Sequence, residues 1–187
     1  MSFGTILLII IVIVAVLGVM AYNSLVSMRQ RVKQSFADID VQMKQRHDLI
    51  PNLVETVKGY AAHEKGTLDD VVKARSAAIA APQGSPQQAQ AEQALSGALG
   101  RLIAISESYP DLKANQNFLE LQQQLADIET KIAAARRFYN SAVSEYNAGI
   151  QAFPAVLFAR SFGFAPETFF DLGEERAQVS QTPSVKF

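Results

Sequence analysis

The sequence predicts an all-α protein with an N-terminal transmembrane helix, an antiparallel up-and-down four-helix bundle and a short C-terminal cap helix. Two observations predict this class. An uncharged apolar stretch opens the chain, and several later stretches carry apolar residues at steps of three and four. The Ala, Gln and Leu content of the chain, with only 9% aromatic residues, favours helices as well. We expect a transmembrane anchor over residues 1–27, the bundle over 28–165 and a C-terminal tail over 166–187.

The predicted anchor is the stretch from Phe3 to Tyr22, which is apolar except for Thr5. No charged residue precedes Arg29. A membrane-spanning helix needs about 20 mostly apolar residues, and this stretch meets that length. The alternative is a signal peptide cleaved near Val19–Ala21, but the stretch lacks a basic start and its apolar core is longer than that of a signal peptide.

The charges that flank the stretch predict its orientation. Its N-terminal side carries no basic residue, whereas five basic residues follow it closely: Arg29, Arg31, Lys33, Lys44 and Arg46. The positive-inside tendency therefore places the bundle in the cytoplasm, on a single-pass protein of the bacterial inner membrane.

The first helix of the predicted bundle extends from Val32 to Tyr60. Its apolar positions form one helical face: Val32, Phe36, Ile39, Met43, Ile50, Leu53, Val57 and Tyr60. The phase of this face continues through Pro51, which predicts one long helix with a kink at the proline.

Capping and proline signals bound the other three helices. The second covers residues 68–79 and ends at Ala81-Pro82. The third begins after Ser85, which precedes a proline at the first helical position, and ends at Tyr109-Pro110. The fourth begins near Asp111 or Asn115 and continues to Ile150 with a near-heptad apolar stripe. A simple two-helix coiled coil is the alternative, but the breaks between the helices disfavour it.

Six phenylalanines fall between Phe153 and Phe170, a density found nowhere else in the chain. We expect a cap helix over Pro154–Phe162 that folds onto the end of the bundle. The alternative is an exposed apolar segment that contacts lipid or a partner. Beyond Gly173 the residues are polar and are expected to be frayed.

Composition and motifs argue against catalysis, cofactors and nucleic-acid binding. Lys and Arg total 17 and Asp and Glu total 18, so no strong positive field attracts nucleic acid. Cysteine is absent, and there is no Gly-rich phosphate loop or nucleophile elbow. His47 and His63 lie about 24 Å apart along a continuous helix and lack the Glu-x-x-His motif of di-iron bundles. We expect no enzyme, cofactor or metal site.

The chain resembles the LemA family from the anchor to about Phe170. The residues that carry the resemblance are Tyr22-Asn23, Arg46–Val54, Val57–Ala61, His63-Glu64, Tyr109–Ala114, Phe118-Leu119, Leu121, Glu129, Ile132, Ala135-Arg136, Tyr139-Asn140, Val143, Tyr146-Asn147 and Phe153-Pro154. The resemblance implies a transmembrane helix and a four-helix bundle. It implies little about mechanism, because the role of the family is poorly defined and some members are linked to membrane organisation or specialised bacterial organelles.

Polar residues within these motifs are the candidates for family or interaction roles. They are Arg46, His47, Pro51, Asn52, Tyr60, His63, Glu64, Arg136, Tyr139, Asn140, Tyr146 and Asn147. We expect Arg46 and Glu55 in the first helix to pair with Glu129 and Arg136 in the fourth. The two Tyr-Asn pairs are seven residues apart and therefore share one helical face.

The sequence favours a membrane-anchored scaffold or adaptor without catalytic activity. Its expected partners are membrane lipid through the N-terminal helix, other membrane proteins and further copies of the chain. The alternative is a ligand- or metal-sensing module at the membrane, with His63-Glu64 or the phenylalanine cluster as its receptor site.

Overall fold

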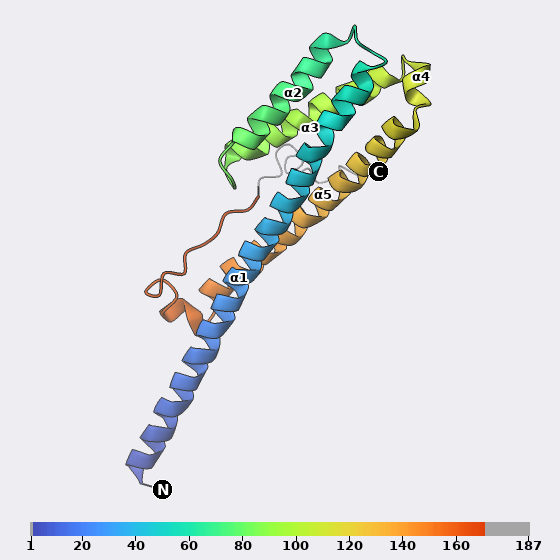
Figure 1. Cartoon of the computed structure of the whole chain (residues 1–187). Coiled ribbons are helices and arrows are strands. Elements are labelled where there is room, and N and C mark those ends of the chain that lie inside the picture. Colours follow the sequence, from blue (N-terminus) through green and yellow to red (C-terminus); the bar gives the residue numbers. More distant parts are fainter. Residues whose placement is uncertain (1, 171–187) are drawn as a thin grey trace, which may run out of the picture. The chain divides into compact units, whose positions relative to one another are not determined.

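A computed structural model describes residues 2–170, and these residues form five α-helices and no strand (Figure 1). The helices are α1 (Phe3–Lys58), α2 (Lys65–Ala80), α3 (Pro86–Ser106), α4 (Pro110–Lys113) and α5 (Gln116–Gln151), followed by the short 3-10 helix η1 (Ala155–Leu157). The predicted all-α class is confirmed. The predicted tail is described only as far as Phe170, so the frayed end expected beyond Gly173 lies outside the described residues.

The chain divides into two compact units. Among the described residues, the first unit comprises those up to Asp40 together with Ala134–Phe169. The second comprises Val41–Ala133 and Phe170. The predicted boundary after residue 27 falls inside α1, which continues without a break to Lys58.

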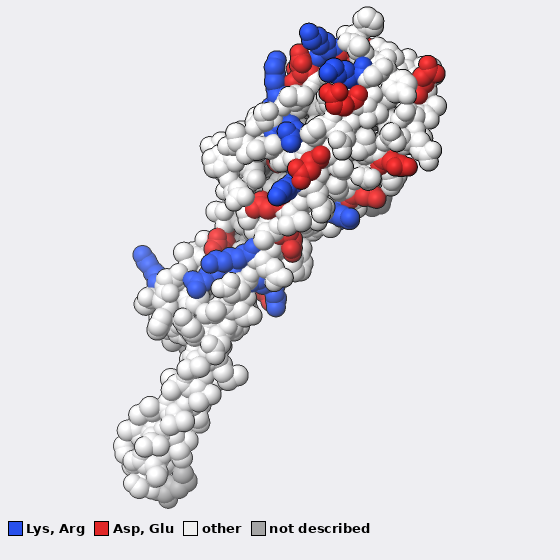
Figure 2. Space-filling view, viewed as in Figure 1, with Lys and Arg blue, Asp and Glu red and all other residues white. Residues whose placement is uncertain are grey.

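The N-terminal part of α1 exposes its apolar side chains, as the predicted anchor requires. Ile10, Val12 and Val14 are each about half exposed or more, and the most apolar window of the helix has no buried residue. Figure 2 shows this end of the chain free of charged atoms, whereas both signs of charge are interspersed over the rest of the visible face. Within the described residues, α1 alone is long and apolar enough to cross a membrane.

The predicted helix boundaries are close to those observed. Ser85 caps α3 by accepting a hydrogen bond from the backbone N–H of Gln88 at 3.1 Å, and Asn115 Oδ1 caps α5 through the N–H of Phe118 at 3.0 Å. The second helix begins at Lys65, slightly before the expected start at Leu68. The short α4 was not predicted.

The core of the second unit draws on every helix of that unit. α1 contributes Ile50, Leu53 and Val57, and the other helices contribute residues such as Val71, Leu95, Leu112 and Phe118. Figure 1 shows α3 running back beside α2. Ile50, Leu53 and Val57 of the predicted apolar face of α1 are therefore packed, whereas Tyr60 at its end is 44% exposed.

In the first unit, α1 and α5 run antiparallel. Arg31 Nη1 lies 2.7 Å from Glu145 Oε2, and further along α1 the rings of Phe36 and Tyr139 meet edge-on at 5.7 Å. In the opposite direction Gly149 lies so close to α1 that a Cβ there would come within 2.8 Å of Met28 Sδ. The residue numbers rise along one helix as they fall along the other.

The predicted cap helix over Pro154–Phe162 is much shorter than expected and needs correction. Only Ala155–Leu157 is helical, as a single 3-10 turn, and separate turns follow. Ala155 and Ala159 are buried, and the backbone N–H of Ala159 donates to the carbonyl oxygen of Ala155 at 2.8 Å. The segment nevertheless leaves helical geometry after Leu157 and turns at Gly163, whose φ of +74° favours glycine.

Candidate functional site

A cluster of charged side chains lies in the second unit. α1 supplies Arg46 and α3 supplies Glu92, both buried, and α5 supplies Glu129, which is about half exposed. Arg46 is 1% exposed and forms an ion pair with the fully buried Glu92 of α3. Arg46 Nη1 also donates to both carboxylate oxygens of Glu129, at 2.8 and 2.7 Å. Ser96 joins them, since its hydroxyl accepts from Arg46 at 2.8 Å and donates to Glu129 at 2.7 Å.

The expected pairing of Arg46 with Glu129 is thus present. Glu55, which was expected to pair with a residue of the fourth helix, instead lies near a residue of its own helix. Glu55 is exposed and lies 3.5 Å from Lys58 on the same helix. The second partner of Arg46 is the buried Glu92, which was not predicted. His47 Nε2 lies 3.0 Å from the other carboxylate oxygen of Glu92.

The environment of Glu92 lowers its pKa. Burial raises the pKa of this carboxyl group, but the hydrogen bond from His47 and the positive charge of Arg46 outweigh burial, so the pKa lies below its ordinary value. Glu92 is therefore held in its charged form as the partner of Arg46. The buried ion pair of Glu92 with Arg46 thus joins α3 to α1.

A second group of motif residues ties the loops at one end of the second unit. Asn115 Nδ2 donates to the hydroxyl of Tyr60 at 2.9 Å, and the hydroxyl of Tyr109 donates to Glu64 Oε1 at 3.0 Å. The bond to Glu64 raises the pKa of Tyr109. Neighbouring His63 is exposed. Among residues 2–170 no group of three or more His, Asp or Glu side chains is placed to hold a metal ion.

The tyrosine and asparagine pairs of α5 lie in the first unit, where they hold the segment that follows η1. The hydroxyl of Tyr139 donates to the backbone oxygen of Thr168 at 3.0 Å. The side-chain amide of Asn147 bonds the backbone of Glu167 twice, donating to its oxygen and accepting from its N–H, each at 2.9 Å. Tyr146 is buried. One member of each pair, Tyr139 and Asn147, therefore bonds the backbone of the segment that contains Glu167 and Thr168.

The remaining motif residues are distinguished by their exposure. Pro51 and Asn52 are exposed on α1, and Arg136 and Asn140 are partly buried on α5. The twelve candidate residues are divided between the two units. Within the second unit, Arg46 and His47 contact Glu92, whereas Tyr60 and Glu64 take part in a separate group of hydrogen bonds.

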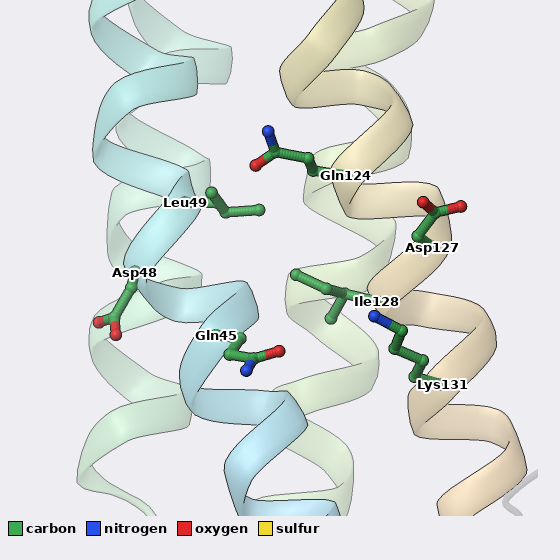
Figure 3. A pocket seen from close by; sticks show the side chains of 7 residues that line it. All are labelled: Gln45, Asp48, Leu49, Gln124, Asp127, Ile128 and Lys131. Atoms are coloured by element: carbon green, nitrogen blue, oxygen red, sulfur yellow. The ribbon is translucent and has the colours of Figure 1, made fainter.

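A surface groove of about 370 Å³ lies between α1 and α5 in the second unit (Figure 3). Leu49 projects into the gap from α1, and Gln124, Ile128 and Lys131 project into it from α5. Asp48 points away to the outer side of α1. The complete lining is Gln45, Asp48, Leu49, Gln124, Asp127, Ile128 and Lys131. Two apolar side chains, Leu49 and Ile128, thus lie among amide and charged groups.

Two comparisons with known proteins bear on this arrangement. The sequence profile of the LemA family matches residues 35–187. The chain is 28% identical to the magnetosome protein MamQ 1 of Paramagnetospirillum magneticum and 27% identical to MamQ of Magnetospirillum gryphiswaldense, over 81% of this chain. The match spans 65% of the length of these relatives, just under two thirds. The chain is also 25% identical to protein LemA of Metamycoplasma hominis, over 84% of this chain and 72% of that protein.

Proposed function

The chain belongs to the LemA family, and on that premise we propose that it is a membrane-anchored, non-catalytic scaffold or adaptor. The observation that carries the proposal is the division of α1 into two chemical parts. Its first residues expose an uncharged apolar surface, whereas Ile50, Leu53 and Val57 of the same helix enter a packed core. A helix of this kind combines a lipid attachment with a folded domain.

The second unit, in this proposal, is an up-and-down four-helix bundle formed by segments of α1, α2, α3 and α5. Support comes from the shared apolar core and from the ion pairs of Arg46 with α3 and α5. The buried charges neutralise one another within this cluster, which suits a structural role better than acid–base chemistry.

The proposed membrane is the bacterial inner membrane, with the bundle in the cytoplasm. The basic residues that follow the apolar stretch support this orientation. The cysteine-free chain allows a direct test with a single cysteine at the exposed Gln90. We expect a membrane-impermeant maleimide to label Gln90→Cys only after the cytoplasmic membrane is permeabilised. Labelling of intact spheroplasts would show that the bundle lies on the opposite side of the membrane.

The proposed partner-binding surface is the groove between α1 and α5. Leu49 and Ile128 provide apolar contact, and Gln45 and Gln124 provide amide groups for a polar rim. A helix of another membrane protein, or of a second copy of this chain, fits this chemistry.

Photocrosslinking in intact membranes tests the adaptor proposal. A photoreactive phenylalanine analogue replaces Gln124 in the groove, and the matched control carries it at Gln90, an exposed glutamine of α3 in the same unit. We expect a discrete adduct from position 124, identified by mass spectrometry as a membrane protein or as this chain, and little from position 90. Recovery of only the uncrosslinked monomer, or of the same adducts from both positions, would reject the proposal.

A further inference from the structure

The segment that follows α5 is almost entirely apolar yet largely exposed. Between residues 152 and 164, Arg160 is the one charged side chain. Phe153, Leu157 and Phe162 are 80%, 73% and 62% exposed. Exposed apolar side chains gathered in one short segment are uncommon on surfaces that face water alone.

This segment lies against the apolar part of α1 within the first unit. The rings of Tyr22 and Phe162 meet edge-on at 5.5 Å, and Phe162 in turn contacts Phe158 at 5.9 Å. An apolar groove of about 390 Å³ separates the two elements. Its lining is Ala15, Gly18, Val19, Tyr22, Phe158 and Phe162.

The position of these contacts along α1 indicates how deep in the bilayer the segment lies when the apolar stretch of α1 spans it. A bilayer core is about 30 Å thick, and the apolar stretch from Phe3 to Tyr22 is about as long. Ala15, Gly18 and Val19 lie in the last two turns of that stretch and so within one leaflet. Because Phe158 and Phe162 border the same groove, they lie at the depth of these turns.

The polar groups of the segment suit the boundary between lipid and water. Arg160 is exposed, and its long side chain can place the guanidinium among anionic headgroups while its stem stays in contact with apolar groups. Tyr22 stands at the end of the apolar stretch, where aromatic residues are enriched at membrane surfaces. Arg29, about two helical turns beyond it, stacks on the ring of Phe164 at 4.8 Å.

We propose that Phe153–Phe162 is a second membrane-contacting element, seated in the leaflet that holds the last two turns of the apolar stretch. Its exposed phenylalanine and leucine side chains enter the acyl-chain region, and lipid fills the groove beside α1. The exposed apolar surface of α1 continues directly onto this segment, which identifies lipid as the occupant. The inference rests on the proposed anchoring by α1 and extends it to a second attachment.

Tryptophan fluorescence tests this proposal cleanly because the chain contains no Trp. The full chain carries one tryptophan at a time, by Phe162→Trp, Leu157→Trp, Val12→Trp or Phe138→Trp, in vesicles of phosphatidylcholine and phosphatidylglycerol. Brominated acyl chains quench tryptophans that they contact. Phe138 is the matched control, since it is an exposed phenylalanine of α5 in the same unit and neighbours Tyr139, which packs on Phe36 far beyond the apolar stretch.

We expect Trp emission from positions 162 and 157 to be blue-shifted and strongly quenched by bromines near the headgroup end of the acyl chains. Position 12 should be quenched by deeper bromines and position 138 by neither. Equal, weak quenching at 162, 157 and 138 would overturn the proposal, and so would a blue shift without quenching, which would show that protein covers the segment. Loss of quenching at position 12 would instead overturn the anchor itself.

Discussion

Arg75 of α2 donates a hydrogen bond from its Nε to the backbone carbonyl oxygen of His47 in α1, at 2.7 Å. In an uninterrupted helix that carbonyl would accept from the N–H of residue 51, but residue 51 is Pro and has no N–H. Arg75 thus satisfies the acceptor that the proline leaves free. This contact explains how α1 continues through Pro51 while it packs against α2.

A double-mutant cycle tests the relationship between Arg75 and Pro51. Arg75→Met keeps an apolar stem and removes the donor, so we expect a loss of about 1–3 kcal/mol in the free energy of unfolding. In a Pro51→Ala background the loss should be smaller, since the substituted alanine supplies a helical N–H to the carbonyl of His47. Circular dichroism of the full chain in nanodiscs, with increasing urea, measures each variant. Additive effects of the two changes would refute the relationship.

The two carboxylates that bind Arg46 should differ strongly in importance. Glu92→Gln leaves the buried Arg46 without its buried counter-charge and should cost about 3–5 kcal/mol of unfolding free energy. Glu129 has a side chain that is 48% exposed, so Glu129→Gln should cost about 1 kcal/mol or less. The same urea titration compares the two. Equal losses would show that Glu92 is not the principal partner.

The lowered pKa of Glu92 predicts a loss of stability in acid. A carboxyl group with a folded-state pKa below its ordinary value of 4.5 contributes its full stabilisation above that pH. The contribution is lost as the pH falls through the lower folded-state pKa. We expect the unfolding free energy of the wild-type chain to decrease more steeply below about pH 4.5 than that of Glu92→Gln. Parallel pH profiles would contradict the assignment.

Substitutions at a buried and at an exposed position should have very different effects on the unfolding free energy. Ile132 of α5 is buried, and Ile132→Ala should cost about 2–5 kcal/mol. Gln90 of α3 is exposed, and Gln90→Ala should change the unfolding free energy by no more than about 0.5 kcal/mol. Thermal unfolding in nanodiscs distinguishes them. Similar costs at both positions would mean that the helix faces are assigned incorrectly.

Asn147 should control the order of the segment that returns along α5. Asn147→Ala removes both side-chain bonds to the backbone of Glu167, so the amide of Glu167 should exchange with solvent faster. Ser144→Ala, at an exposed position of the same helix, serves as the control. Hydrogen exchange followed by mass spectrometry reads the peptides that contain Glu167. Unchanged exchange in Asn147→Ala would show that these bonds do not hold the segment.

Local signals in the sequence predicted much of the fold because their effects are local. Ser85 and Asn115 cap helices through their own neighbouring backbone, and the apolar spacing of Ile50 and Leu53 predicts which face of α1 packs. The cap helix predicted over Pro154–Phe162 is wrong because the backbone hydrogen bonds of this segment mix two spacings. The N–H of Leu157 donates to the carbonyl of Pro154 and that of Ala159 to the carbonyl of Ala155, so the segment forms separate turns and no continuous α-helix.

The candidate site was harder to predict because its contacts join residues distant in sequence. Pro51 in the sequence indicates that one backbone carbonyl of the helix lacks its usual N–H donor. The sequence does not indicate which side chain replaces that donor, because only the packing of α2 against α1 brings Arg75 to the carbonyl of His47. Glu92 did carry a signal. It lies four residues after Gln88 and three before Leu95, both buried, so it occupies the inward face of α3 and requires a cationic partner such as Arg46.

The central claim is that the apolar part of α1 anchors the chain in a membrane, and extraction of isolated membranes with alkaline carbonate tests it. We expect the wild-type chain to stay in the membrane pellet. A Leu8→Arg/Val12→Arg variant, with two charges in the apolar stretch, should move to the soluble fraction. Release of the wild-type chain by carbonate, or retention of both chains to the same extent, would contradict the account.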